Sequence, residues 1–272
     1  FHPPVAVART ADLTSPSGVR LRAYHPAGFR ADHLPGIVYF HGGGWVMGDL
    51  ETHDTLCRHL ANAAGAVVIA VDYRLAPENP FPAAFDDAVA AVRHVAEISK
   101  ELGIDPGRLA VAGDSAGGNL AAAVCLHARE QGGPAIALQC LLYPVLDAGC
   151  DTAAYTAFAD GHGLTRDKMR FFWKSYLGTA SPENPYAVPL AAENLSGLPP
   201  ALVLTAEYDV LRDEGEQFGK RLVAAGVEVE MIRCEGVIHG FLHYAGAIRR
   251  GQSVLREVGQ LIAARLAPGR NP

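Results

Sequence analysis

The chain has 272 residues and a net charge of −6 at pH 7, with 49% hydrophobic and 19% charged residues. This composition is typical of a globular protein with a sizeable core. The negative charge argues against nucleic acid or an anionic membrane as a main partner, because both attract basic surfaces. No apolar run approaches the roughly 18 residues that a membrane-spanning helix needs.

The cysteine pattern argues for a reducing environment. The five cysteines are scattered, and none forms a C-x-x-C pair, so neither a disulfide framework nor a structural metal site is expected. Residues 1–4 show no basic region followed by an apolar core, the pattern that begins a signal peptide. We therefore expect a cytoplasmic protein without a structural metal, and both a monomer and a homodimer remain open.

Short apolar runs alternate with helical segments along most of the chain. Residues 5–26 alternate loosely around a turn at 15–18, which predicts two edge strands in a hairpin. Buried strands are expected at 36–40, 66–71, 108–112, 135–143, 200–206 and 227–233. Helices are expected at 52–64 with Thr52 as N-cap, 83–102, 119–129, 165–176 with Thr165 as N-cap, 212–225 and 245–266. This alternation predicts an α/β fold with a mostly parallel sheet and helices on both faces.

Residues 147–190 interrupt the alternation. The segment is rich in aromatic residues, including Phe171, Phe172 and Trp173. An aromatic-rich insertion after a strand end can form a lid or pocket wall, or it can merely fasten the insertion to the core. Since no repeat or linker is visible, we expect one domain over residues 1–272 with a cap insertion at 147–190.

The most informative stretch is G-D-S-A-G, from Gly113 to Gly117. It lies between an expected buried strand and an expected helix, which is the context of a nucleophile elbow. In such a turn the serine holds a strained backbone angle, and the two glycines let the strand and the helix approach closely. A chance match is the alternative, but the context favours Ser115 as a nucleophile. We expect the neighbouring Asp114 to bond adjacent loops.

Three consecutive glycines follow His41 directly after the expected strand at 36–40. Backbone N–H groups in such a loop can stabilise a developing negative charge, and H-G-G-G is the donor loop that accompanies G-x-S-x-G. We expect the N–H groups of Gly42, Gly43 and Ala116 to form an oxyanion hole. His41 is expected to organise the loop by bonding its carbonyl groups. A flexible glycine turn is the alternative.

A serine hydroxyl needs a base to take its proton, and a carboxylate to orient that base. In this type of fold the chain order is serine, acid, histidine. His239 lies in the loop before the last expected helix, and Asp209 follows the expected strand at 200–206. Glu207 and Asp213 compete with Asp209. Glu207 lies near the buried strand end, however, and Asp213 lies in a first helical turn, where an acid offsets the helix dipole.

Five motifs occur together in this order: H-G-G-G-W at 41–45, D-Y-R-L-A-P-E at 72–78, G-D-S-A-G-G-N at 113–119, Y-D-V-L-R-D-E at 208–214 and H-G-F at 239–241. Together they resemble the hormone-sensitive-lipase-like esterases and related microbial and plant carboxylesterases, over most of the chain from Gly36. The resemblance implies an α/β-hydrolase fold with Ser115 as nucleophile, His239 as base and Asp209 as its orienting acid. It also implies hydrolysis of short- to medium-chain acyl esters without a cofactor.

The same residues leave other reactions open. Sugar deacetylation, lactone opening and amide hydrolysis can use this machinery, and some plant relatives are non-catalytic receptors. The intact set of Ser115, Asp209 and His239 argues against a receptor, and no amphipathic lid of a true lipase is evident. Members of the family usually carry a helical N-terminal cap segment, whereas this chain is strand-like by Val5. We therefore expect either a shortened cap or a cap segment that was removed.

Overall fold

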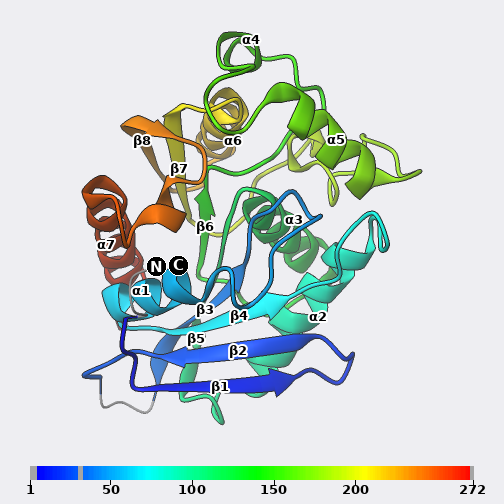
Figure 1. The fold of residues 1–272 in the computed structure, drawn as a ribbon. Coiled ribbons are helices and arrows are strands. Elements are labelled where there is room, and N and C mark those ends of the chain that lie inside the picture. Colours follow the sequence, from blue (N-terminus) through cyan, green and yellow to red (C-terminus); the bar gives the residue numbers. More distant parts are fainter. Residues whose placement is uncertain (1–4, 30–32, 270–272) are drawn as a thin grey trace.

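The computed structural model describes residues 5–29 and 33–269. Residues 1–4, where the signal-peptide pattern was sought, lie outside this part of the chain. Eight strands form one sheet in the order β1-β2-β4-β3-β5-β6-β7-β8 (Figure 1). Strand β2 is antiparallel to both of its neighbours, and the other neighbouring pairs are parallel. This is the predicted α/β-hydrolase arrangement, with a mostly parallel sheet.

The strands are β1 (Arg9–Thr14), β2 (Arg20–His25), β3 (Leu34–Phe40), β4 (Val67–Asp72), β5 (Ile104–Asp114), β6 (Leu138–Leu142), β7 (Ala201–Tyr208) and β8 (Val229–Ile238). The α-helices are α1 (Asp54–Ala64), α2 (Ala83–Glu97), α3 (Ala116–Gln131), α4 (Ala153–Ala157), α5 (Arg166–Leu177), α6 (Arg212–Ala224) and α7 (Arg249–Arg265). Two short 3₁₀ turns, η1 (Pro189–Ala191) and η2 (Phe241–Tyr244), complete the set.

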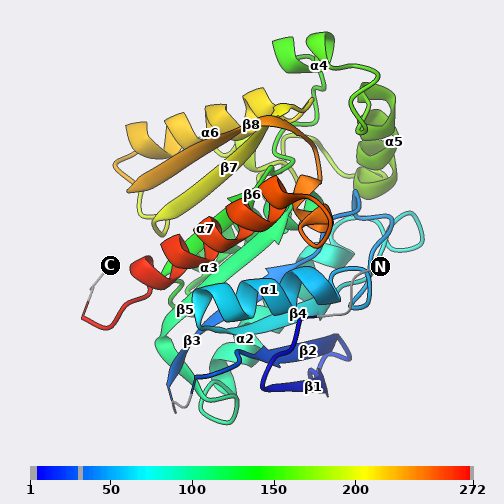
Figure 2. The ribbon, with the colours of Figure 1, turned by 60° about the vertical axis from the view of Figure 1, so that its left-hand side comes forward.

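Helices cover both faces of the sheet, as the alternation predicted. Helices α1 and α7 lie together on one face (Figure 2), and their apolar residues share a core with the strand residues that point that way. Helices α2, α3 and α6 contribute to the core on the opposite face. Strands β3 and β4 are buried almost throughout, because a parallel sheet covered on both sides leaves their side chains no solvent.

Several sequence predictions are confirmed. The N-terminal hairpin forms between β1 and β2. Thr165 caps α5, because its hydroxyl accepts a hydrogen bond from the N–H of Lys168. Gly65, which the sequence places directly after the expected helix at 52–64, ends α1 in the left-handed conformation that favours glycine at a helix C-terminus.

Other element boundaries were wrong. Thr52 does not cap α1, because it lies one residue before the N-cap position. Its hydroxyl donates to the carbonyl of Asp49 instead. Helix α2 ends at Glu97, and the residues up to Gly103 form turns. Strand β8 continues to Ile238, and η2 separates it from α7. Local patterns do not resolve such ends, since neighbouring segments decide where a ladder or a helix stops.

The segment between β6 and β7 carries α4, α5 and η1 and no strand of the sheet. In Figures 1 and 2, α4 and α5 lie at the opposite end of the molecule from β1 and β2. Helix α5 is fixed to the body by aromatic packing. The ring of Trp45 stacks on Tyr176 with ring centroids 4.1 Å apart, and it also contacts Trp173 at 4.7 Å. Helix α5 therefore packs against the glycine-rich loop.

The two glycines of the elbow are required by close backbone approach. A methyl group on Gly117 would overlap the carbonyl oxygen of Phe40, and one on Gly113 would overlap the carbonyl of Gly117. Gly117→Ala is therefore expected to lower the free energy of unfolding by about 3 kcal/mol or more. Gly132→Ala is the control, because Gly132 ends the same helix, α3, and a Cβ there would have nothing within 4 Å. Its expected cost is about 1 kcal/mol, from the left-handed backbone alone.

Urea unfolding of the two variants measures this difference. Equal midpoints for Gly117→Ala and Gly132→Ala would show that the backbone at the elbow can relax, and would contradict the close-approach explanation.

Candidate active site

Ser115 lies in a sharp turn between β5 and α3. Its φ of 55° and ψ of −118° are unusual for a residue other than glycine, and such a conformation persists only where surrounding contacts hold it. Its N–H donates to the carbonyl of Leu142 at 2.8 Å, and its carbonyl accepts from the N–H groups of Asn119 and Val145, both at 3.2 Å. These bonds to β6, α3 and the following loop hold the turn. The predicted strained elbow is therefore confirmed.

Ser115, His239 and Asp209 form a continuous series of hydrogen bonds. His239 Nε2 is 3.0 Å from Ser115 Oγ, and His239 Nδ1 is 2.7 Å from Asp209 Oδ2. Asp209 is 1% exposed, and its Oδ1 accepts from the N–H of Leu211 at 3.0 Å. A buried carboxylate on Nδ1 favours the tautomer with its proton there. Nε2 is then free to accept the proton of the serine hydroxyl.

The two competing carboxylates are bonded elsewhere. Glu207 accepts a hydrogen bond from the N–H of Gly236 at 2.7 Å. Asp213 accepts from the N–H of Ala154 at 2.7 Å and pairs with Arg212 at 2.9 Å. Both therefore serve local structure, and Asp209 is the carboxylate that contacts His239.

The expectation that Gly42 supplies an oxyanion donor was wrong. Its N–H donates to Asp114 Oδ1 at 2.9 Å and is not free to bind a substrate. Among the residues that the structure describes, the N–H groups of Gly43, Gly44 and Ala116 donate to no protein acceptor. The shift by one glycine has a simple cause. Gly42 lies only two residues after the end of β3 and still lies beside Asp114, the last residue of the neighbouring strand β5.

His41 organises the glycine loop, as the sequence predicted. Its Nδ1 lies 2.8 Å from the carbonyl oxygen of Gly42, and its ring stacks on Tyr73 with centroids 4.1 Å apart. The hydroxyl of Tyr73 donates to the carbonyl of His41 at 2.7 Å. Burial lowers the pKa of His41 to about 4, so the ring is neutral at pH 7 and its Nδ1–H is a fixed donor.

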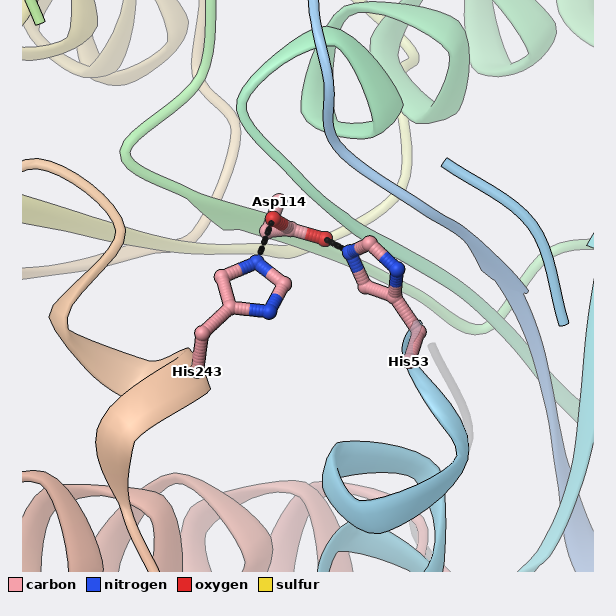
Figure 3. Close-up of side chains that lie close together, drawn as sticks. All are labelled: His53, Asp114 and His243. Atoms are coloured by element: carbon pink, nitrogen blue, oxygen red, sulfur yellow. Dashed lines mark hydrogen bonds and ion pairs between the residues drawn. The ribbon is translucent and has the colours of Figure 1, made fainter. Parts of the chain in front are cut away.

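Asp114 bonds neighbouring loops, also as predicted, but the sequence did not identify its histidine partners. His243 Nε2 lies 2.9 Å from Asp114 Oδ2, and His53 Nε2 lies 3.4 Å from Oδ1 (Figure 3). The hydroxyl of Tyr39 donates to Oδ1 at 2.7 Å. No spacing in the sequence links His53, before α1, to His243 in η2, because only the folded sheet brings them together.

His53, Asp114 and His243 are also the group of metal-type ligands found among residues 5–29 and 33–269, with ligand atoms within 4.8 Å of one another. Hydrogen bonds account for this group, since each carboxylate oxygen of Asp114 already accepts from protein donors. The sequence expectation of no metal stays a prediction.

Apolar side chains border the serine and histidine loops. The ring of Phe172 occupies the space where a side chain at Gly44 would lie, and Ile238 Cδ1 lies near Gly163 of the segment between β6 and β7. Ile238 is 40% exposed, and Met47 in the glycine loop is 56% exposed. Exposed apolar side chains therefore lie within the glycine loop and directly before His239. In the described part of the chain, no helix is both long and apolar enough to cross a membrane.

Comparisons with known proteins show which family the chain is similar to. Residues 37–243 match the model of a family described as having the alpha/beta hydrolase fold. The chain is 45% identical to the esterase LipI of Mycobacterium tuberculosis over 251 residues, which cover 91% of this chain and 78% of LipI. It is also 45% identical to the carboxylesterase NlhH of the same organism, over 87% of this chain and 75% of NlhH.

Solved structures give the same result. EstE1, a carboxylesterase cloned from a metagenomic library, superposes with a TM-score of 0.92 at 43% identity, covering 97% of this chain and 91% of EstE1. An esterase from Pyrobaculum calidifontis superposes with a TM-score of 0.89 at 44% identity, covering 95% and 84%. By these matches, the chain belongs to the hormone-sensitive-lipase-like family of alpha/beta hydrolase fold proteins.

Proposed function

We propose that the protein is a serine carboxylesterase that hydrolyses short- to medium-chain acyl esters. The observation that carries this proposal is the hydrogen-bonded series Ser115–His239–Asp209, with distances of 3.0 and 2.7 Å. The similar proteins described as esterases and carboxylesterases support it. The same intact series disfavours a non-catalytic receptor, which has no need for an activated hydroxyl.

The reaction has two halves. Ser115 Oγ attacks the ester carbonyl while its proton passes to His239 Nε2, and Asp209 stabilises the resulting imidazolium. The tetrahedral intermediate expels the alcohol, which takes that proton and leaves an acyl-Ser115 ester. Water then attacks the acyl group and gives a proton to His239, and the carboxylic acid leaves as Ser115 recovers the proton. No cofactor takes part in these steps.

We propose Gly43, Gly44 and Ala116 as the oxyanion donors, in place of the set with Gly42. The free N–H groups of these three residues support the assignment, since an oxyanion hole needs donors that no protein acceptor already occupies. Each donor typically contributes on the order of 10²–10³ in rate. Gly43 and Gly44 also have φ values of 116° and 61°, which turn the loop backbone in a way that favours glycine.

We further propose that residues 1–272 form one domain in which residues 147–190 act as a cap. The contact of Phe172 with Gly44 supports a pocket wall beside the oxyanion donors. A cytoplasmic location is supported by five buried free cysteines, which a reducing compartment preserves. The expected partner is a small ester, and the choice between a monomer and a homodimer stays a prediction.

Rapid mixing with p-nitrophenyl butyrate tests the function. We expect a burst of p-nitrophenol that approaches one equivalent per protein, followed by slower turnover as the acyl-enzyme is hydrolysed. A panel of acetate, butyrate, octanoate, lactone, acetylated-sugar and anilide substrates then ranks the leaving groups. A higher kcat/KM for lactones, acetylated sugars or anilides than for simple esters would replace carboxylesterase by the corresponding activity.

A further inference from the structure

Groups from residues 39–53 and from η2 converge on one buried carboxylate, that of Asp114. Figure 3 shows two of them, His53 and His243, on either side of it. Tyr39 reaches it from β3, Gly42 from the glycine loop, His53 from the residue before α1, and His243 from η2. Asp114 is 1% exposed. A buried carboxylate is costly unless donors surround it, and here the donors come from β3, the glycine loop and η2.

The charges within this cluster complement one another. Burial alone would raise the pKa of Asp114, but His53 and His243 outweigh burial and hold that pKa well below its usual range. Burial likewise lowers the pKa of His243, but the charge and hydrogen bond of Asp114 outweigh it and raise that pKa overall. The geometry and the charges therefore describe an ionised Asp114 whose hydrogen bond to His243 is charge-assisted when His243 is protonated.

The positions of the bonded groups matter for chemistry. Gly42, held by Asp114 Oδ1, directly precedes the proposed oxyanion donor Gly43. His243, held by Oδ2, lies four residues after His239 and in the turn that follows it. Asp114 itself directly precedes Ser115. The residue before the nucleophile thus carries a carboxylate that accepts hydrogen bonds from groups near the base and near the oxyanion donors.

We propose that Asp114 and His243 form a positioning pair. The pair holds the glycine loop and the turn after His239 in the correct position relative to Ser115. This inference rests on the proposed esterase function and adds two positioning residues to it. Neither side chain touches the reacting atoms. Their effect is on kcat, because a displacement of about 1 Å at a catalytic group can cost on the order of 10²-fold in rate.

His243→Gln and Asp114→Asn are the test variants, and each keeps a side chain of similar shape. We expect kcat for p-nitrophenyl butyrate to fall about 10- to 100-fold in each, with KM changed less than threefold. The double variant should fall little further than Asp114→Asn, since both single changes break the same bond. His59→Gln is the matched control, because His59 is a half-buried histidine on α1 outside this cluster. It should keep the wild-type kcat.

The outcomes are distinct. If wild type turns over the ester and His243→Gln matches it in kcat, the positioning pair is excluded while the esterase proposal stands. If wild type itself does not turn over any ester, the proposed function fails first. Multiplicative losses in the double variant would also exclude a shared role. Circular dichroism distinguishes a variant that has not folded. If Asp114→Asn does not fold, His243→Gln alone decides, because His243 is 29% exposed and lies at the edge of the cluster.

The pair also predicts a pH dependence of stability. The pKa of His243 is raised in the folded protein, so the pair stabilises fully below the unfolded pKa of about 6.5. That contribution is lost as the pH rises through the folded pKa. Asp114 and His53 are the titratable groups that face His243 in the cluster. The difference in Tm between wild type and His243→Gln should therefore be larger at pH 6 than at pH 9. A difference that grows with pH would contradict the ion pair.

Discussion

Ser115→Ala is expected to lower kcat for p-nitrophenyl butyrate by about 10⁴- to 10⁶-fold, with no burst of p-nitrophenol. The hydroxyl is the atom that forms the acyl-enzyme, and its removal leaves only the oxyanion donors and substrate binding to accelerate attack by water. The fold should be kept, because the hydrogen bonds that hold the elbow come from the backbone of Ser115. Stopped-flow absorbance and circular dichroism measure both results.

Ser253→Ala is the matched control for this change. Ser253 is an exposed serine on α7, and its hydroxyl donates only to the carbonyl of Arg250. It should retain the wild-type burst and turnover. Undiminished turnover by a well-folded Ser115→Ala protein would refute the acyl-serine mechanism.

Asp209→Asn is expected to lower kcat by about 10⁴-fold while KM changes little. An asparagine at this position fits the same space, and its carbonyl can keep the bond from the N–H of Leu211. Its NH₂ group would then face His239 Nδ1, where the carboxylate now accepts a hydrogen bond at 2.7 Å. A donor there favours the tautomer with the proton on Nε2, which cannot take the proton of Ser115.

Asp213→Asn is the control for charge removal nearby. Asp213 lies in the first turn of α6 and bonds Ala154 and Arg212, so its change should alter kcat by less than about threefold. Equal losses in Asp209→Asn and Asp213→Asn would mean that the loss follows from the general charge of the loop. The proposed role of Asp209 in orienting His239 would then be untenable.

Much of the fold could be predicted from the sequence, because parallel strands buried on both sides read as short apolar runs between helices. The elbow could be identified in the sequence because close backbone contacts require glycine at Gly113 and Gly117. The position of His239 followed from its place between the last strand and the last helix. These features are encoded locally, or by order along the chain.

What could not be predicted depends on contacts across the sheet. Gly42 and Gly44 are both glycines of the same loop, so the sequence does not distinguish them. Only the folded structure shows that Asp114, at the end of β5, accepts the N–H of Gly42. His53 and His243 belong to segments 190 positions apart in the numbering (243 − 53) and meet only through Asp114. Helix ends were missed for a related reason, as at α7, which begins at Arg249 because residues 245–247 form turns after η2.

A crystal structure of the protein inactivated by a p-nitrophenyl alkylphosphonate tests the central claim most directly. The phosphonyl group imitates the tetrahedral intermediate, and we expect its phosphorus to be bonded to Ser115 Oγ. One phosphonyl oxygen should lie about 3 Å from the nitrogens of Gly43, Gly44 and Ala116, with the N–H of Gly42 still on Asp114. An adduct on another residue, or an oxygen that points away from these three nitrogens, would contradict the account.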